Sequence, residues 1–175
     1  MFIKGEKVAL RAVEMKDADI LYQWENDMDL WHISNTKIPF SKFTIEQYVM
    51  NGGQDIYTAR QLRLMIDLTQ KSTTIGTIDL FDFDPSNRRA GVGIMIRKEY
   101  REQGYASECL DLLIKYCFST LNLHQLYCNI LENNEASIKL FESKKFIISG
   151  KKIDWISTND GWASELILQL INTVN

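Results

Sequence analysis

The segment from Ala90 to Ser107 is the most informative part of this chain and reads AGVGIMIRKEYREQGYAS. Its first residues form an apolar strand, a charged turn with Arg101 and Gly104 follows, and an amphipathic helix begins at Tyr105. The first N–H groups of a helix have no partners inside the helix and lie at the positive end of its dipole. Glycine lets an anion approach them. The segment therefore predicts an anion-binding loop.

Two widespread phosphate-binding loops are missing from the sequence. There is no Gly-x-x-x-x-Gly-Lys-Ser/Thr, and no Gly-x-Gly-x-x-Gly that follows a strand and has an acidic residue downstream. The loop thus indicates a phosphate-bearing ligand without a standard nucleotide-binding fold. A glycine that serves only to turn the chain before the helix is the alternative.

Size and composition predict one ordinary globular domain over residues 1–175, with 45% apolar and 25% charged residues. A net charge of −3 and no Lys/Arg run longer than two argue against nucleic acid as a partner. No apolar run approaches the roughly 20 residues that span a bilayer, and the N-terminus does not resemble a signal peptide. We therefore predict a cytoplasmic protein that does not act at a membrane.

The cysteines and histidines give no sign of a metal site. Three cysteines, an odd number, suit a reducing compartment, and Cys109, Cys117 and Cys128 fall at positions typical of small core residues. His32 and His124 are far apart in the sequence and have no nearby ligand partners. We expect no bound metal.

Hydrophobic periodicity predicts an α/β domain. Expected helices cover 17–26, a segment capped by Thr44 and ended by Gly52-Gly53, 105–120, and a segment capped by Asn134. Expected strands cover 8–12, 62–68, 75–81, 90–96, 126–131, and a last hairpin of 146–157 and 162–170 around the turn at 158–161. Hairpins followed by strand–helix–strand crossovers predict a single mixed, mostly antiparallel sheet with helices on both faces.

Two motifs carry a family resemblance. The first is Arg101-x-x-Gly104-x-Ala106, and the second is Asn134-Glu-Ala-Ser137-x-x-Leu140-Phe141, with Phe146 after it. In this order and separation they make the chain resemble the GCN5-related N-acetyltransferase (GNAT) superfamily over almost its whole length. The strand entry Asn87-Arg-Arg-Ala90 and the aromatic-rich last hairpin make it most similar to the branch of spermidine N-acetyltransferases and ribosomal-protein N-terminal acetyltransferases.

The resemblance implies transfer of an acetyl group from acetyl-CoA, a cosubstrate, to a primary amine by direct attack in a ternary complex. In such enzymes the fourth and fifth strands splay apart and the pantetheine lies between them. The resemblance implies that Ile94, Met95 and Ile96 offer main-chain groups to it, and that Asn134 binds the pantetheine arm or only caps its helix. The pyrophosphate would lie on Arg101, Glu102, Gln103, Gly104, Tyr105, Ala106 and Ser107.

The chain departs from the family pattern at three acid/base positions. Phe141 stands where relatives often have a tyrosine acid, Asn129 where they often have a glutamate base, and Gly91 where a glutamate often precedes the fourth strand. Ser137 is the best substitute for the acid near the sulfur; its alternative is a hydroxyl bonded to the helix backbone.

The base has two candidates, since Asp154 matches the place of a glutamate base in ribosomal-type relatives and Asp79 is its rival. A plain surface role is the alternative for each aspartate. The segment Glu25–Trp31 could line the amine-binding mouth, or be a solvated helix end. Polyamine enzymes carry paired acids where this chain has Ile33-Ser34-Asn35, which weakens a spermidine assignment.

The predicted function is thus an acetyl-CoA-dependent N-acetyltransferase with a small-molecule or peptide amine as acceptor: a polyamine, a protein N-terminus or another small amine. The alternative is a catalytically impaired acyl-CoA-binding regulatory module, which the missing acid/base groups favour. A phosphate-ligand enzyme of another class is a third, weaker alternative. The sequence leaves the acceptor and the oligomeric state open, a homo-oligomer included.

Overall fold

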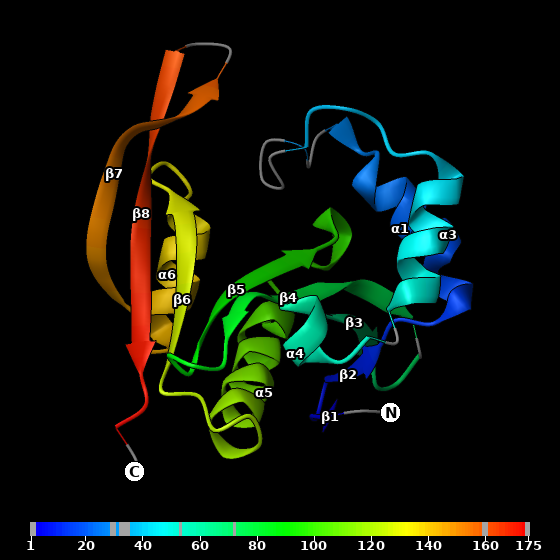
Figure 1. The fold of residues 1–175 in the computed structure, drawn as a ribbon, viewed down its shortest axis with the longest axis horizontal. Helices are drawn as coiled ribbons and strands as arrows, with labels where there is room; N and C mark the ends of the chain where they lie inside the picture. Colours follow the sequence, from blue (N-terminus) through cyan, green and yellow to red (C-terminus); the bar gives the residue numbers. More distant parts are fainter. Residues whose placement is uncertain are drawn as a thin grey trace.

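The computed structural model describes residues 3–28, 31, 36–52, 54–71, 73–158 and 161–173. In these residues eight strands form one sheet in the order β1-β2-β3-β4-β5-β6-β8-β7 (Figure 1). Only β5 and β6 pair in parallel among these neighbours. The strands are β1 (Ile3–Lys4), β2 (Val8–Ala12), β3 (Leu62–Leu68), β4 (Thr74–Asp84), β5 (Arg89–Ile96), β6 (Gln125–Leu131), β7 (Ile147–Thr158) and β8 (Gly161–Ile171).

Helices cover both faces of this sheet, which confirms the predicted α/β architecture. They are α1 (Ala18–Glu25), α3 (Lys42–Asn51), α4 (Ile56–Ala59), α5 (Tyr105–Ser119) and α6 (Glu135–Ser143), with short 3-10 turns η1 (Met15–Asp17) and η2 (Lys98–Tyr100). The main apolar cluster lies on the face of α5 and α6. A second cluster forms where α1 and α3 pack on the opposite face around Met65.

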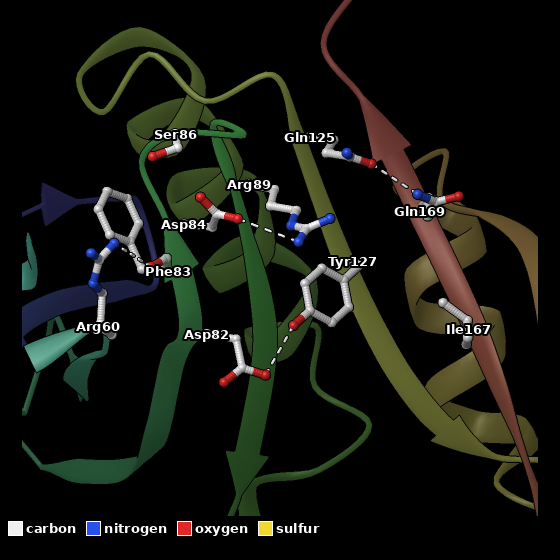
Figure 2. Close-up of a pocket in the computed structure, with 10 residues that line it drawn as sticks. All are labelled: Arg60, Asp82, Phe83, Asp84, Ser86, Arg89, Gln125, Tyr127, Ile167 and Gln169. Atoms are coloured by element: carbon white, nitrogen blue, oxygen red, sulfur yellow. Dashed lines mark hydrogen bonds and ion pairs between the residues drawn. The ribbon is translucent and has the colours of Figure 1, made fainter.

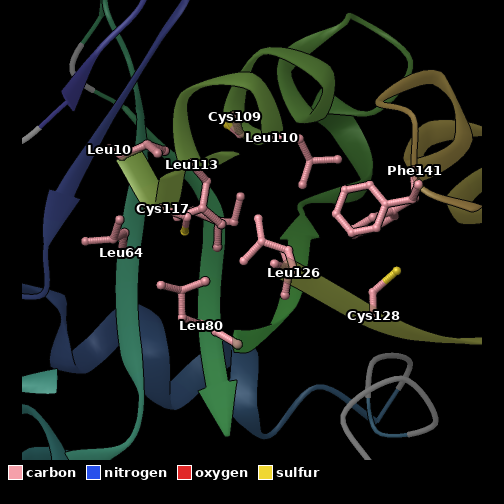
Figure 3. Packing of buried hydrophobic residues seen from close by; sticks show 14 of the residues in the cluster. Leu10, Leu64, Leu80, Cys109, Leu110, Leu113, Cys117, Leu126, Cys128 and Phe141 are labelled. Carbon is pink, nitrogen blue, oxygen red and sulfur yellow. The ribbon is translucent and has the colours of Figure 1, made fainter. Parts of the chain in front are cut away.

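The main cluster follows from the alternation of the strands and the apolar stripe of α5. Leu110 and Leu113 of the helix are fully buried against strand residues such as Leu64 and Leu126 (Figure 3). Leu64 faces this cluster and its neighbour Met65 faces the second, because successive side chains of a strand point to opposite faces. The sheet therefore separates the two apolar clusters and contributes side chains to both.

The three cysteines lie in the main cluster, as predicted for core residues. Cys109, Cys117 and Cys128 are all buried and form no disulfide. Burial raises the pKa of each thiol, to about 12 for Cys117 and for Cys128. They are inert fillers of the core in the folded chain.

Helix starts differ from the prediction in the first third of the chain. The helix α3 is capped by Ser41, whose hydroxyl oxygen accepts the N–H of Thr44 at 3.1 Å, so the predicted cap at Thr44 is wrong by one turn. The sequence did not predict α4, which Asp55 caps by accepting the N–H groups of Tyr57 and Thr58. Several residues of the predictions lie outside the described part: His32, Ile33, Ser34, Asn35, Gly53, Asn159 and Asp160.

Candidate functional site

The two parallel strands separate soon after they begin. Their pairing joins Arg89 with Gln125, Ala90 with Leu126 and Gly91 with Tyr127, and then ends. Yet β5 continues to Ile96 and β6 to Leu131, and Figure 1 shows the two strands diverging beyond the pairing. A sheet that opens in this way leaves strand edges unpaired on both sides of the gap.

The register determines which main-chain groups of β5 face the gap. The N–H of Arg97 donates to the carbonyl of Ile75, just before Gly76 of β4, at 2.9 Å. Main-chain groups alternate in direction along an antiparallel strand, so those of Met95 face β4 and those of Ile94 face the gap. The prediction that Met95 offers its main chain to a ligand does not fit this register, whereas the prediction for Ile94 does.

The facing edge of β6 follows the same rule. The N–H of Glu132, next after β6, donates to the carbonyl of Ser164 of β8 at 3.0 Å. Main-chain groups two residues apart point the same way, so Ile130 faces β8 and Asn129 faces the gap. The paired part of β5 and β6 ends before Ile94 and Asn129, so their main-chain groups are directed into the gap from opposite sides.

The loop after β5 gathers unpaired N–H groups. Gly104 has φ 83° and ψ 0°, a left-handed conformation that favours glycine, and it caps α5 without a side-chain bond. The first paired N–H of the helix is that of Glu108, which donates to the carbonyl of Gly104 at 3.2 Å. No N–H from Glu102 to Ser107 donates to any residue that the structure describes. Tyr105, Ala106 and Ser107 are half-buried at the helix start.

Two predicted site residues brace this loop with their side chains. The Nε of Arg101 donates to the carbonyl of Ile96 at 2.9 Å, and the Nε2 of Gln103 donates to the carbonyl of Glu99 at 3.1 Å. Arg101 thereby occupies the carbonyl of Ile96, which faces the gap. In this structure the Arg101 side chain holds the loop against the end of β5.

A cation that the sequence did not point to lies at the same loop. A Cβ added to Gly104 would lie 3.6 Å from the Nζ of Lys7. The main chain of Lys7 is fixed: its N–H donates to the Glu108 carboxylate at 3.0 Å and 3.3 Å, and its carbonyl accepts the N–H of Thr69 at 3.0 Å. Its ammonium has no ion-pair partner in the described part of the chain. Lys7 is 97 residues from Gly104, so no local pattern could link them.

The second motif places the hydroxyl of Ser137 in the first turn of α6, the helix that follows β6. Asn134 caps α6, because its Oδ1 accepts the N–H of Ser137 at 3.2 Å. The hydroxyls of Ser119 and Ser143 donate to helix carbonyls at 2.6 Å. The hydroxyl of Ser137 makes no such bond to any described residue. The structure therefore does not support the alternative that Ser137 is tied to its own helix backbone.

The departures from the family pattern have structural counterparts. Phe141 is buried and packs edge-on against Phe146, with ring centroids 5.0 Å apart. A Cβ added to Gly91 would lie 2.3 Å from the ring of Phe81, so that ring occupies the place of a side chain. Asn129 is exposed on β6. None of these three positions supplies a proton.

The two aspartates proposed as base differ in their surroundings. Asp154 is exposed on a bulge of β7 with φ 49°, and β8 separates that strand from β6. Asp79 lies on β4 directly opposite Gly93 of β5. Its Oδ1 accepts a hydrogen bond from the Nε–H of Arg63 at 2.8 Å. Burial raises the pKa of Asp79, and the Arg63 guanidinium opposes that shift.

The segment predicted to line an amine mouth is only partly described. The carboxylate of Glu25 does not point to solvent but pairs with Arg63 at 2.5 Å. The indole N–H of Trp31 donates to the carbonyl of Glu25 at 2.9 Å. Asp29 and Leu30 lie outside the described residues. The end of α1 is thus tied to the same arginine as Asp79.

A polar hollow of about 740 Å³ lies where β5 and β6 are still paired (Figure 2). Its groups largely satisfy one another: Asp84 with Arg89 at 3.3 Å, and the Tyr127 hydroxyl with Asp82 at 3.1 Å. Burial and the neighbouring Asp82 raise the pKa of Tyr127 to about 12. The hollow lies at the closed end of the gap and has no excess of either charge.

Two kinds of feature are absent from the part of the chain that the structure describes. No group of three or more His, Cys, Asp or Glu side chains there could hold a metal ion. Of the helices that the structure describes, none is both long and apolar enough to cross a membrane.

Comparisons with known proteins agree with this geometry. A family model described as an acetyltransferase (GNAT) domain matches residues 7–147. The N-acetyltransferase p20 of Bacillus licheniformis is 30% identical over 151 residues, which is 86% of this chain and 84% of that protein. Spermidine N(1)-acetyltransferase of Vibrio cholerae is 24% identical over 153 residues, 86% of this chain and 84% of its own.

The fold also matches a solved structure of spermidine N-acetyltransferase from Vibrio cholerae in complex with CoA and spermine. The TM-score is 0.86 at 20% identity, over 95% of this chain and 96% of that one. At this identity the likeness concerns the fold, and the family model and p20 carry the assignment. The chain belongs to the GNAT acetyltransferase family.

Proposed function

We propose that this chain transfers the acetyl group of acetyl-CoA to a primary amine within a ternary complex. The observation that carries the proposal is the gap between β5 and β6, which ends beside the loop of unpaired N–H groups at the start of α5. An extended ligand of one strand's width suits the gap, and an anionic end suits the loop. Acetyl-CoA combines both features.

Each part of the proposed ligand has a counterpart in the chain. Main-chain groups of Ile94 and Asn129 would hold the pantetheine arm from its two sides, as an added strand is held. The N–H groups from Glu102 to Ser107, with the ammonium of Lys7, would hold the diphosphate. The missing side chain of Gly104 leaves room for a phosphate oxygen against the backbone.

The reaction sets demands that specific groups would meet. The N–H of Ile94, already directed into the gap, would stabilise the oxyanion that forms on the acetyl carbon's oxygen. The unbonded hydroxyl of Ser137 would donate a proton to the departing sulfur. An alkyl amine has a pKa of roughly 10, so a base must also take a proton from it. Asp154 and its rival Asp79 are the two candidates for this base.

The names of relatives support a class of acceptor. Relatives named spermidine N-acetyltransferases act on a polyamine, which supports a small amine as acceptor. A protein N-terminus and other small amines remain in the proposed class. Activity is tested by release of free CoA from acetyl-CoA across a panel of amines that includes spermidine, short peptides with free N-termini and simple alkyl amines.

A second candidate function is an acyl-CoA-binding module without turnover. The observation that favours it is the set of Phe141, Asn129 and Gly91, at positions where relatives often carry acid or base groups. This candidate predicts saturable acetyl-CoA binding with no CoA release from any amine of the panel. CoA release that depends on the added amine would reject it.

The phosphate loop is tested by two substitutions of similar shape. Asn and Asp both tolerate the left-handed conformation of Gly104 better than most residues, and they differ by one negative charge. Calorimetric titration with acetyl-CoA should show weaker binding for Gly104→Asn and much weaker binding for Gly104→Asp. If both variants bind acetyl-CoA as tightly as the wild type, the diphosphate does not lie at this loop.

A further inference from the structure

The geometry points to Asp79 as the carboxylate that binds the ammonium group of the acceptor and takes its proton, with Arg63, Glu25 and Tyr48 as its positioning residues. This inference rests on the proposed function and names the part of the site that faces the amine. Three observations carry it: the place of Asp79 beside the gap, the open space over Gly93, and the charge of the cluster.

Asp79 lies one strand away from the gap. It pairs directly with Gly93 of β5, and two residues past the Gly91–Tyr127 pair the opposite edge is formed by Asn129. Neighbouring strands are about 4.8 Å apart, so an amine that lies over Gly93, between the gap and β4, is within reach of the Asp79 carboxylate. Asp154 lies on the outermost strand and has no such relation to β5.

Among the described residues, little lies close to the place of the side chain that Gly93, the partner of Asp79, lacks. A Cβ added to Gly93 would have a single heavy-atom neighbour within 4 Å, in the ring of Phe81 at 3.9 Å. Side chains of Asp79 and Gly93 share the face of the sheet that carries α1 and α3, opposite to α5. An amine that enters over this face would meet the acetyl group at the edge of β5 with Asp79 beside it.

The cluster around Asp79 has one negative charge in excess. Arg63 serves two carboxylates: its Nε is 2.8 Å from Oδ1 of Asp79 and its Nη1 is 2.5 Å from Oε1 of Glu25. The ring of Tyr48 lies 5.6 Å from the guanidinium carbon and covers it. All three ion-pair partners are about three-quarters buried. A site of two carboxylates and one cation can accept one more cation.

The proposed reaction conserves atoms and charge. The ammonium of the acceptor gives one proton to the carboxylate of Asp79, and its lone pair attacks the acetyl carbon. The carbon–sulfur bond then breaks, and the thiolate takes the second amine proton. That proton moves directly or through the Ser137 hydroxyl, which gives up its own proton and receives that of the amine, and Asp79 releases its proton to solvent. The products are the amide, free CoA with its thiol and one proton.

The chain offers a matched control for Asp79→Asn. Asp67 on β3 is also a partly buried aspartate paired with an arginine, since its Oδ2 is 2.7 Å from the Nε of Arg11. It pairs across the sheet with Ala9 of β2, away from the gap. Asp67→Asn therefore removes a similar ion pair without touching the proposed amine site.

The first measurement is calorimetric binding of spermidine to the wild type, Asp79→Asn and Asp67→Asn, each loaded with CoA. We expect Asp79→Asn to lose most of the amine affinity, Asp67→Asn to keep it, and all three to bind CoA alike. Equal amine binding by both variants and the wild type, or no amine binding by the wild type, would overturn the inference. Amine binding to the CoA-loaded wild type, with no CoA release when acetyl-CoA is supplied in place of CoA, would instead reject only the proposed transferase function.

The second measurement separates the base role from a structural one. With an alkyl amine, which is cationic at pH 7, Asp79→Asn should lower kcat/KM at least about 100-fold. With an aromatic amine, which is uncharged at pH 7, the loss should be much smaller. Raising the pH should narrow the difference between the variant and the wild type for the alkyl amine only. The groups facing Asp79 in this titration are Glu25 of α1, Tyr48 of α3 and Arg63 of β3. An equal loss for both amines at every pH would show that Asp79 only supports the fold.

Discussion

Replacing Lys7 by Gln should weaken acetyl-CoA binding, because it removes an ammonium group that lies beside the loop at Gly104. The ammonium lies 3.6 Å from the position of a Cβ on Gly104. A phosphate oxygen that takes the place of this Cβ against the Gly104 backbone would thus lie about 4 Å from Nζ. Two unit charges 4 Å apart interact by about 1 kcal/mol in water and about 4 kcal/mol in a medium of intermediate polarity.

Lys7 is exposed, so the lower part of that range applies, and we expect a loss of about 1–2 kcal/mol. This corresponds to a roughly 5- to 30-fold rise in Kd for Lys7→Gln. Lys7→Glu should cost about twice as much free energy, since it turns an attraction into a repulsion. Added salt should reduce the difference between the variants, because exposed charges are screened beyond a Debye length of about 10 Å at 0.1 M salt.

The assay is calorimetric titration with acetyl-CoA at low and high salt. Lys16→Gln is the control: it removes the same charge at an exposed lysine that pairs with Glu14 at 3.0 Å. Melting temperatures of both variants check the fold, because the main chain of Lys7 is bonded to Glu108 and Thr69. An unchanged Kd for Lys7→Gln, or an equal loss of affinity for Lys16→Gln, would show that Lys7 does not interact with the bound diphosphate.

Two further predictions concern stability. Gly91→Ala should lower the free energy of unfolding by about 1–3 kcal/mol in urea titrations, since its Cβ would lie 2.3 Å from the ring of Phe81. Gly93→Ala is the control and should cost clearly less, because its Cβ would have a neighbour only at 3.9 Å. Equal losses of stability for the two variants would contradict the clash with Phe81. Burial tends to raise the pKa of Asp17, but its bonds to Arg11 and to the main chain prevail and lower it. Because this pKa is lowered on folding, Asp17 stabilises the chain above roughly pH 4 and loses that effect as the pH falls further. Asp17→Asn should thus cost about 1–3 kcal/mol at pH 7 and flatten the acid limb of the stability profile, and an unchanged limb would speak against this pair.

The sequence predicted those parts of the fold that depend on local periodicity. Alternating residues from Leu62 to Leu68 form β3, and the apolar stripe of α5 is buried as expected. The cap of α3 was misplaced because Ser41 and Thr44 both offer hydroxyls three residues before a suitable N–H. The single turn of α4 has too few residues to show a helical period.

The site was predictable only where it is contiguous in the chain. The loop around Gly104 is one short segment, so its backbone conformation follows from the glycine and the helix that comes after it. The ammonium of Lys7 reaches this loop through the pairing of β1 and β2 and the contact with α5, which no local spacing shows. The union of Glu25, Arg63 and Asp79 likewise depends on three elements that tertiary packing brings together.

The burial of the three cysteines makes the chain convenient to assay. A thiol with a pKa of about 12 is almost wholly protonated at pH 8, and Cys109, Cys117 and Cys128 are also shielded by the main cluster. Colorimetric disulfide reagents should therefore report the sulfhydryl of product without background from the enzyme. The same cysteines become accessible to alkylation once the cluster opens. Their rate of alkylation would therefore measure how fast α5 separates from the sheet.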